Sequence, residues 1–395
     1  MKVASSVYDV AWHPGQRDLL ACATSTGGKI LNMERPETEA VQLGTDGTYC
    51  VAWSPAGHLL VTLGKQNVVW NSHGARVATL LAQPGGWEGN PQFNGSGSLV
   101  AITRLKILVR ECDVFDTLTG VLKHSLEIFG ESIAWKDDRE LFCCGGMGSI
   151  THLRIGQAEP LRIMTGASQF ATTMAFNPEK DILAFGGRDG TVRLWSSGVT
   201  TLTGHTEGVR GLVWISQNSG FLASYSQDQV RIWDAIAETN LHVYEGFFSS
   251  SSNSKSCYGM SHISFSPDGQ FFAAAGRFQN VKVIKVSTGK IVAECEENGI
   301  AVSWSRGNNK LAVKSICGPN IVDGVLNPVE EAVSVYNLEN LIGINLKAMS
   351  MKCVASLLEK NLTNGKEQAK EFLTNERIPE TLISGVLLMF HIKMY

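Results

Sequence analysis

The segment from Leu202 to Asp234 reads LTGHTEGVRGLVWISQNSGFLASYSQDQVRIWD. Apolar and polar residues alternate along its short runs, as they do in strands that bury one face. Glycine, asparagine, aspartate and serine separate these runs and favour tight turns. The segment therefore predicts a series of short β-strands joined by turns.

The pattern around Trp214 returns along most of the chain. An aromatic residue in a similar setting recurs at intervals of 38 to 51 residues, in phrases such as Val-Ala-Trp-His-Pro and Ile-Ser-Phe-Ser-Pro. A period near forty residues, built from short strands, predicts a β-propeller in which each repeat forms one four-stranded blade. The anchors are Trp12, Trp53, Phe93, Trp135, Phe176, Trp214, Phe265 and Trp304. We therefore expect an all-β propeller with eight blades.

The composition narrows the class of protein. A net charge of −3 gives no basic field for nucleic acid. Residues 1–10 are polar and indicate a strand rather than a signal peptide, and the apolar stretch 383–390 is too short to span a bilayer. Nine cysteines without a Cys-x-x-Cys pair favour free thiols in a reducing compartment. We expect an intracellular protein, nuclear or cytoplasmic and not secreted, whose partners are proteins.

Four residues of the Leu202–Asp234 segment suit a buried hydrogen-bonded chain from a turn through an imidazole and a hydroxyl to an indole. They are His205, Ser224, Asp228 and Trp233. His205 and Asp228 would also suit a catalytic pair, but their position in the repeat favours a structural role. Phosphate-loop, His-Glu-x-x-His and Gly-x-Ser-x-Gly motifs are absent from the sequence. We expect no enzymatic activity, no metal and no cofactor.

The same segment resembles a known repeat. Gly204-His205, Asp228 and Trp233-Asp234 are similar to the signature of the WD40 repeat, and residues 183–195 carry a related LAFGGRDGTVRLW. This resemblance implies a WD40 propeller.

A more specific resemblance covers about residues 7 to 337. The phrase THLRIGQAEPLRIMTG at 151–166 and the order of its neighbours are similar to the transducin-β-like corepressor subunits, which carry eight WD40 repeats. It implies a subunit of a nuclear corepressor or chromatin assembly. Those subunits have an N-terminal LisH oligomerisation region, whereas this sequence starts directly with its first repeat and continues beyond the last.

Closure of the ring requires a strand shared between the ends of the repeat region, so that no sheet edge stays open. The outer strand of the last blade can come from residues 1–4 or from residues after Tyr336. We favour the N-terminal segment. The propeller would then occupy residues 1–338.

Residues 339–395 change to a helical period, which predicts a helical C-terminal extension with an apolar stripe. The stripe would either pack on the propeller or bind a partner helix. Its residues are Ile342, Leu346, Met349 and Leu357.

Partner-binding residues are expected where loops enter the innermost strands and where turns join the middle strands. Tyrosine and arginine are enriched at binding hot spots, and clustered arginines would favour an acidic or phosphorylated partner. Trp87 lies between Gly85-Gly86 and Glu88-Gly89. Its side chain would either fill a pocket of the propeller or stay exposed to bind a partner. The candidates are Tyr8, Tyr49, Lys65, Trp87, Arg188, Arg210 and Arg277.

These patterns together predict a non-enzymatic scaffold subunit of a multiprotein complex, with a corepressor or chromatin assembly as its setting. The alternative is an architectural subunit of a large cytoplasmic or ciliary complex. A substrate receptor of a ubiquitin ligase is disfavoured, because Ile236 stands where the Trp-Asp-x-Arg docking signature needs arginine.

Overall fold

The computed structural model divides the chain into two compact units, residues 1–338 and 339–395. All described residues belong to the first unit, and the predicted helical extension, with Ile342, Leu346, Met349 and Leu357, lies outside them. The described residues are 2–5, 7–15, 18–35, 38–80, 86–87, 91–106, 109–128, 132–144, 149–157, 161–164, 171–215, 220–227, 229–245, 260–276, 279–306, 310–317, 321–322, 325–326 and 330–337.

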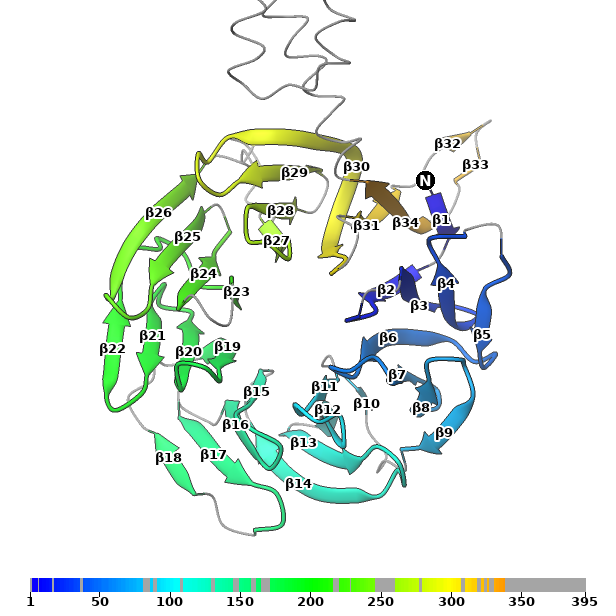
Figure 1. Cartoon of the computed structure of the whole chain (residues 1–395), viewed down its shortest axis with the longest axis horizontal. Coiled ribbons are helices and arrows are strands. Elements are labelled where there is room, and N and C mark those ends of the chain that lie inside the picture. Colours follow the sequence, from blue (N-terminus) through cyan, green and yellow to red (C-terminus); the bar gives the residue numbers. More distant parts are fainter. Residues whose placement is uncertain are drawn as a thin grey trace, which may run out of the picture. The chain divides into compact units, whose positions relative to one another are not determined.

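The described part of the chain forms eight four-stranded antiparallel blades around a common axis, which confirms the predicted propeller (Figure 1). In each blade the strand nearest the axis comes first, and the chain then moves outward. Blades 1 to 4 contain β2 (Val7–Trp12), β3 (Leu19–Thr24), β4 (Gly27–Asn32) and β5 (Val41–Leu43); β6 (Thr48–Trp53), β7 (Leu59–Gly64), β8 (Val68–Asn71) and β9 (Arg76–Thr79); β11 (Gln92–Phe93), β12 (Leu99–Lys106), β13 (Val109–Asp116) and β14 (Leu122–Ile128); and β15 (Ile133–Trp135), β16 (Glu140–Cys144), β17 (Ile150–Arg154) and β18 (Arg162–Met164).

Blades 5 and 6 contain β19 (Ala171–Asn177), β20 (Ile182–Gly187), β21 (Val192–Trp195) and β22 (Val199–Leu202), and then β23 (Gly211–Trp214), β24 (Phe221–Tyr225), β25 (Gln229–Asp234) and β26 (Thr239–Glu245). Blades 7 and 8 are built from β27 (Met260–Phe265), β28 (Phe271–Gly276), β29 (Gln279–Lys285), β30 (Ile291–Trp304), β31 (Lys310–Cys317), β34 (Glu330–Asn337) and β1 (Lys2–Ser5). Two short additions are β10 (Gly86–Trp87), which pairs with β12, and the hairpin of β32 (Ile321–Val322) and β33 (Val325–Leu326).

The N-terminal strand closes the ring, as we expected. β1 pairs antiparallel with β34 and becomes the outer strand of blade 8. Blades 7 and 8 are continuous, because β30 pairs with β29 as far as Asn298 and with β31 from Gly299 onward. A Cβ at Gly299 would lie only 2.1 Å from Val281 Cγ2, so glycine is required where this strand passes from one blade to the next.

The tryptophan anchors explain the repeat period in physical terms. Each anchor lies at or near the end of an innermost strand, and each of the five anchor indoles donates to the carbonyl one residue before the anchor of the preceding blade. These bonds are Trp12 to Ser303 (3.0 Å), Trp53 to Ala11 (3.1 Å), Trp135 to Gln92 (2.9 Å), Trp214 to Ala175 (3.2 Å) and Trp304 to Ser264 (2.8 Å). Since buried indoles and carbonyls need partners, each bond stabilises a blade interface, and that of Trp12 joins blade 1 to blade 8.

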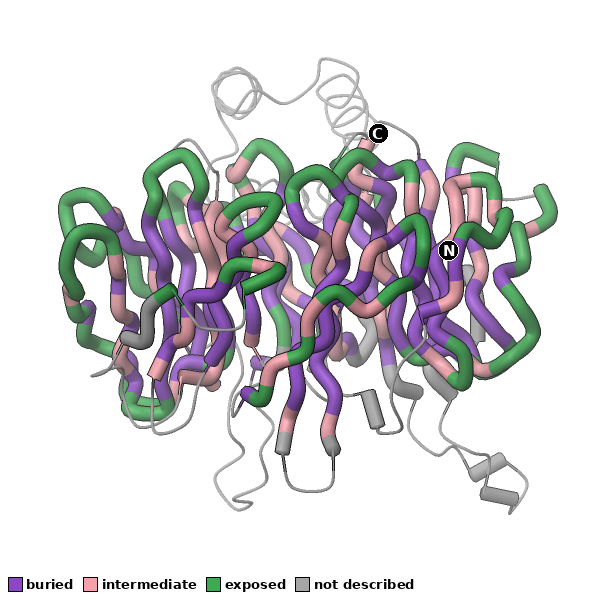
Figure 2. The backbone as a smooth tube through the Cα atoms, turned by 90° about the horizontal axis from the view of Figure 1, so that it is seen from below, coloured by how far each residue is buried: buried purple, intermediate pink, exposed green. Residues whose placement is uncertain are grey.

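A second set of contacts recurs three residues before the anchor. There, Asp9, Ser132 and His262 each accept a hydrogen bond from a backbone N–H of the next blade's innermost strand. Apolar clusters fill the space between blades: one buried cluster, for example, joins Val61 and Leu63 of blade 2 to Val100 and Phe115 of blade 3. Figure 2 shows the result, with buried backbone along the strands and exposed backbone at the turns of both faces.

Candidate partner-binding surface

One face of the propeller carries the predicted binding residues. In an antiparallel blade, the start of the innermost strand and the turn between the second and third strands lie at the same end. This face, here called the loop face, therefore presents the starts of β2 and β6, with Tyr8 and Tyr49. It also presents the β7–β8 turn with Lys65 and the β20–β21 turn with Arg188.

Tyr8 and Tyr49 are exposed at equivalent positions of neighbouring blades. Their exposed fractions are 43% and 41%, which are high for tyrosines within strands. Lys65 is exposed, and its backbone N–H donates to Gly47 in the loop that leads to Tyr49. Lys314 of blade 8 donates through Nζ to the carbonyl of Tyr8. We call Tyr8, Tyr49, Lys65 and Lys314 the tyrosine sector.

A half-buried carboxylate holds the two tyrosine-bearing strands together. Asp9 Oδ2 accepts from the backbone N–H of Val51 at 3.0 Å and from Cys50 Sγ at 3.1 Å. Burial raises the pKa of Asp9, and burial together with the neighbouring Asp9 raises the pKa of Cys50. Because Asp9 and Cys50 adjoin the exposed tyrosines, this contact fixes the spacing of the two strands that carry them.

The arginines lie elsewhere on the same face. Arg188 and Arg210 belong to blades 5 and 6, across the ring from blades 1 and 2 (Figure 1). The Arg210 guanidinium donates to Gln227 Oε1 at 3.0 Å and to the Met260 carbonyl at 3.3 Å, so it bridges blades 6 and 7. The structure therefore separates these arginines from the tyrosines. Arg277 lies outside the described residues.

Blade 3 contains a buried ionic cluster that the sequence analysis missed. Arg104 on β12 is 2% exposed and donates to Asp113 Oδ2 at 2.6 Å, and it also forms an ion pair with Glu111. Ser125 donates to the other Asp113 oxygen at 2.6 Å. Charged residues inside otherwise apolar runs were the available signal. The Trp87 backbone pairs beside Arg104, while the Trp87 side chain lies outside the described residues.

Blade 6 contains the imidazole, hydroxyl and indole of the expected hydrogen-bonded chain. Ser224 Oγ accepts from the Trp233 indole at 2.8 Å and lies 2.6 Å from His205 Nε2. Burial, with a smaller contribution from Arg231, lowers the pKa of His205 to about 4. Asp228 lies outside the described residues. Blade 2 has a related pair, in which the Trp70 indole donates to Thr62 Oγ1 at 2.8 Å.

The described residues contain no group of three or more histidine, cysteine, aspartate or glutamate side chains arranged to hold a metal ion. No helix within these segments is long and apolar enough to cross a membrane.

Comparison with known proteins supports the repeat. The family model described as "WD domain, G-beta repeat" matches residues 158–196 and 197–234, which cover blade 5 and the first three strands of blade 6. Telomerase protein component 1 of Rattus norvegicus is 24% identical over 331 residues, covering 77% of this chain, and the Mus musculus protein is 23% identical over 327 residues. This chain spans 11% of the length of each. Pre-mRNA-processing factor 19 homolog 2 of Arabidopsis thaliana is 29% identical over 123 residues, covering 30% of this chain and 21% of that protein.

Solved structures match over a longer part of the chain. The C-terminal WD40 domain of Sif2 superposes with a TM-score of 0.69 at 19% identity, covering 85% of this chain and 97% of that domain. The computationally designed Ika8 protein gives a TM-score of 0.63 at 18% identity, covering 85% of this chain and 96% of that protein. The chain therefore contains WD40 repeats folded as an eight-bladed β-propeller, a fold that generally serves protein interaction rather than catalysis.

Proposed function

We propose that this protein is a non-enzymatic scaffold subunit of a multiprotein complex, and that it holds a segment of a partner protein on the tyrosine sector. The observation that best supports this proposal is the exposure of Tyr8 and Tyr49 at equivalent positions of adjacent blades. Tyrosine supplies a large contact area and loses little conformational entropy on binding, so paired exposed tyrosines suit a binding hot spot.

The charges of the sector define the partner further. The ammonium group of Lys314 donates to the backbone carbonyl of Tyr8, and Lys65 is exposed on the turn whose backbone contacts the loop before Tyr49, so the sector carries two lysines. An acidic or phosphorylated segment complements this arrangement and would be attracted from a distance. Arg188 and Arg210, across the ring, are proposed as a second point of contact for a partner long enough to cross the face.

The complex itself is proposed to be a nuclear corepressor or chromatin assembly. The alternative is an architectural role in a large cytoplasmic or ciliary complex. The relatives are named for telomerase and for pre-mRNA processing rather than for repression, so they support neither choice directly.

The test is quantitative mass spectrometry of proteins that co-purify with the tagged full-length chain from cells that express it. The Tyr8→Ser/Tyr49→Ser variant removes both phenol rings. A Leu118→Ser/Val121→Ser variant is the matched control, because these exposed apolar side chains lie on the β13–β14 turn of the opposite face. We expect a defined set of partners to fall about tenfold in the tyrosine variant alone, which corresponds to about 1.4 kcal/mol.

The identity and behaviour of the co-purified proteins decide the outcome. Histone deacetylase components among the lost partners would support the corepressor assignment, and axonemal or other cytoskeletal components would support the architectural one. Full retention of all partners by the tyrosine variant, or equal loss in the control, would overturn the tyrosine sector as the binding surface.

The predicted apolar stripe of residues 339–395 is proposed as a second docking element. A chain that ends at Leu338 separates its contribution from that of the propeller. Partners lost on this truncation but kept by the Tyr8→Ser/Tyr49→Ser variant would belong to the C-terminal extension. If the truncated chain keeps every partner, the stripe has no docking role.

A further inference from the structure

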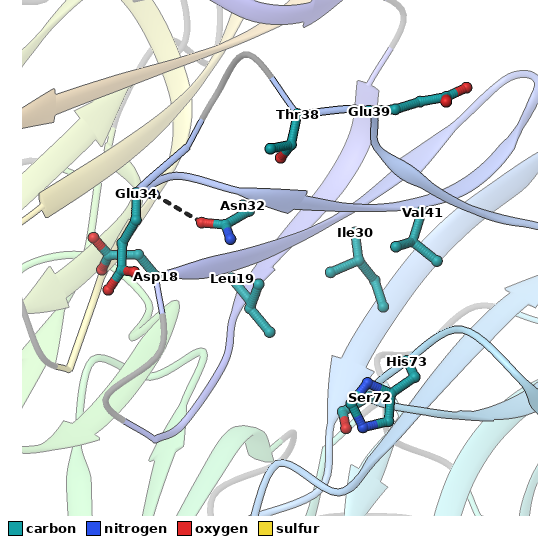
Figure 3. A pocket seen from close by; sticks show the side chains of 10 residues that line it. All are labelled: Asp18, Leu19, Ile30, Asn32, Glu34, Thr38, Glu39, Val41, Ser72 and His73. Carbon is teal, nitrogen blue, oxygen red and sulfur yellow. Dashed lines mark hydrogen bonds between the residues drawn. The ribbon is translucent and has the colours of Figure 1, made fainter.

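The face opposite the loop face contains a cavity of about 490 Å³ in blades 1 and 2 (Figure 3). Strands β3, β4 and β5, the β4–β5 connection and the β8–β9 turn form its walls. Its volume lies in the range of sites that bind small molecules. None of the residues proposed to bind a partner on the loop face lines it.

The floor of the cavity is apolar. Leu19, Ile30 and Val41 point into it, and Val41 is 40% exposed although it is a β-branched strand residue. The opposing turn packs tightly against this floor, since a Cβ at Gly74 would lie 2.3 Å from Val41 Cγ1. The wall between the two blades is therefore preformed.

The rim of the cavity is acidic. Asp18 is buried and already forms an ion pair with Lys310. Glu34 and Glu39 are exposed, and among the described residues neither has an ion-pair partner. The side chain of Asn32 accepts from the Glu34 backbone N–H at 2.9 Å and so fixes the start of the connection that carries both glutamates.

The lining contains no lysine or arginine. His73, on the β8–β9 turn, is its only basic side chain, and Arg35 lies on the same connection without lining the cavity. Lys310 neutralises Asp18, so the negative charge of the rim is that of Glu34 and Glu39, and this charge favours a cation.

The geometry selects an organic cation over a metal ion. The described residues offer no set of three metal-ligating side chains here or elsewhere, and the cavity is much larger than an ion. An arginine side chain fits both parts of the lining. Its aliphatic stem would cover the floor of Leu19, Ile30 and Val41, while its planar guanidinium would donate to Glu34, which lies beside Asp18 at one end of the cavity (Figure 3). Glu39, at the other end, would add negative charge to the rim.

We infer that this cavity binds an arginine side chain on a basic segment of a partner protein. The site lies outside the proposed function of the loop face and takes a partner of opposite charge. One propeller would thus bind an acidic segment on one face and a basic segment on the other.

The test uses the full-length protein and fluorescence anisotropy of a labelled peptide with two arginines in an alanine–serine background. The same peptide with citrulline, which keeps the shape and removes the charge, is the matched probe. Glu34→Gln/Glu39→Gln removes the acidic rim. Glu179→Gln/Glu207→Gln makes the same change in net charge at exposed positions away from the cavity.

We expect the citrulline peptide to bind about tenfold more weakly than the arginine peptide, and the rim variant to bind the arginine peptide about tenfold more weakly than the unaltered protein. The charge-matched control and Tyr8→Ser/Tyr49→Ser should stay within about twofold. Equal binding of both peptides, no binding of the arginine peptide, or an equal loss in the charge-matched control would overturn the inference. Loss only in the tyrosine variant would overturn it too, and would place the basic segment on the loop face. A lysine peptide that binds more tightly than the arginine peptide would contradict the guanidinium geometry.

Discussion

Trp53 and Tyr49 lie four residues apart on the same strand and have opposite environments. Trp53 is 9% exposed and bonded to blade 1, whereas Tyr49 is 41% exposed on the loop face. Blade 1 repeats the contrast, with Trp12 at 8% and Tyr8 at 43%. Each tyrosine is the extra residue of a β-bulge, where the register with the second strand shifts between Val7 and Asp9 and between Thr48 and Cys50. The bulge breaks the regular alternation, so the tyrosine and the anchor of one strand can have opposite environments. The end of the strand that carries the tryptophan contacts the neighbouring blade, whereas the tyrosine near its start is exposed and can contact a partner.

The strongest test of this contrast is to remove an anchor. Trp53→Ala should lower the free energy of unfolding by about 3 to 5 kcal/mol, because it leaves a cavity and an unpaired carbonyl. Trp53→Phe fills most of the space and should cost about 1 to 3 kcal/mol, the effect of the missing indole donor. Urea unfolding of both variants measures the difference. A Trp53→Phe variant as stable as the unaltered protein would show that the indole hydrogen bond contributes nothing to the interface.

The buried imidazole of blade 6 should make stability depend on pH. Its pKa is about 4 in the folded protein, so the unfolded chain binds a proton at higher pH than the folded one does. The contribution of His205 is therefore complete above pH 6.5 and is lost as the pH falls towards 4. Between pH 7 and pH 5 the unaltered protein should lose about 2 kcal/mol more than His205→Gln, measured by urea unfolding at both pH values. Parallel losses in the two proteins would show that His205 does not carry the effect.

The hydrogen bonds three residues before the anchor predict a smaller effect. Ser132→Ala removes the acceptor of the Met174 backbone N–H, which lies 2.9 Å from Ser132 Oγ. We expect a cost of about 1 kcal/mol and a faster amide hydrogen exchange at Met174. Unchanged exchange at that amide would mean that the bond is not formed in solution.

The smallest effect on stability is expected for the exposed tyrosines. Tyr8→Ser/Tyr49→Ser should change the free energy of unfolding by no more than about 0.5 kcal/mol for each substitution, because both side chains are exposed. The same variant should lose partner binding. A loss in the free energy of unfolding comparable to that of Trp53→Phe would instead show that the tyrosines stabilise the fold.

The parts of the fold that repeat were the parts that the sequence predicted. The anchors recur because each indole binds the preceding blade, and the N-terminal closing strand follows from the need to cover the last sheet edge. The arrangement of the candidate residues relative to one another could not be predicted from the sequence, because it depends on how the blades meet. Arg210, for example, donates hydrogen bonds to Gln227 and to Met260 and so joins blades 6 and 7, and no local sequence pattern predicts this contact. The cavity beside Glu34 and Glu39 depends on an irregular connection that belongs to one blade only.

The most direct measurement places a photo-activated cross-linking amino acid at position 49, and separately at position 118 of the opposite face, in the full-length protein inside cells. Mass spectrometry then identifies the attached peptides. The proposed function predicts that position 49 captures an acidic or phosphorylated segment of one recurrent partner, and that position 118 does not capture it. Capture of the same partner from position 118, or no recurrent partner from position 49, would contradict the assignment of the loop face as the binding surface.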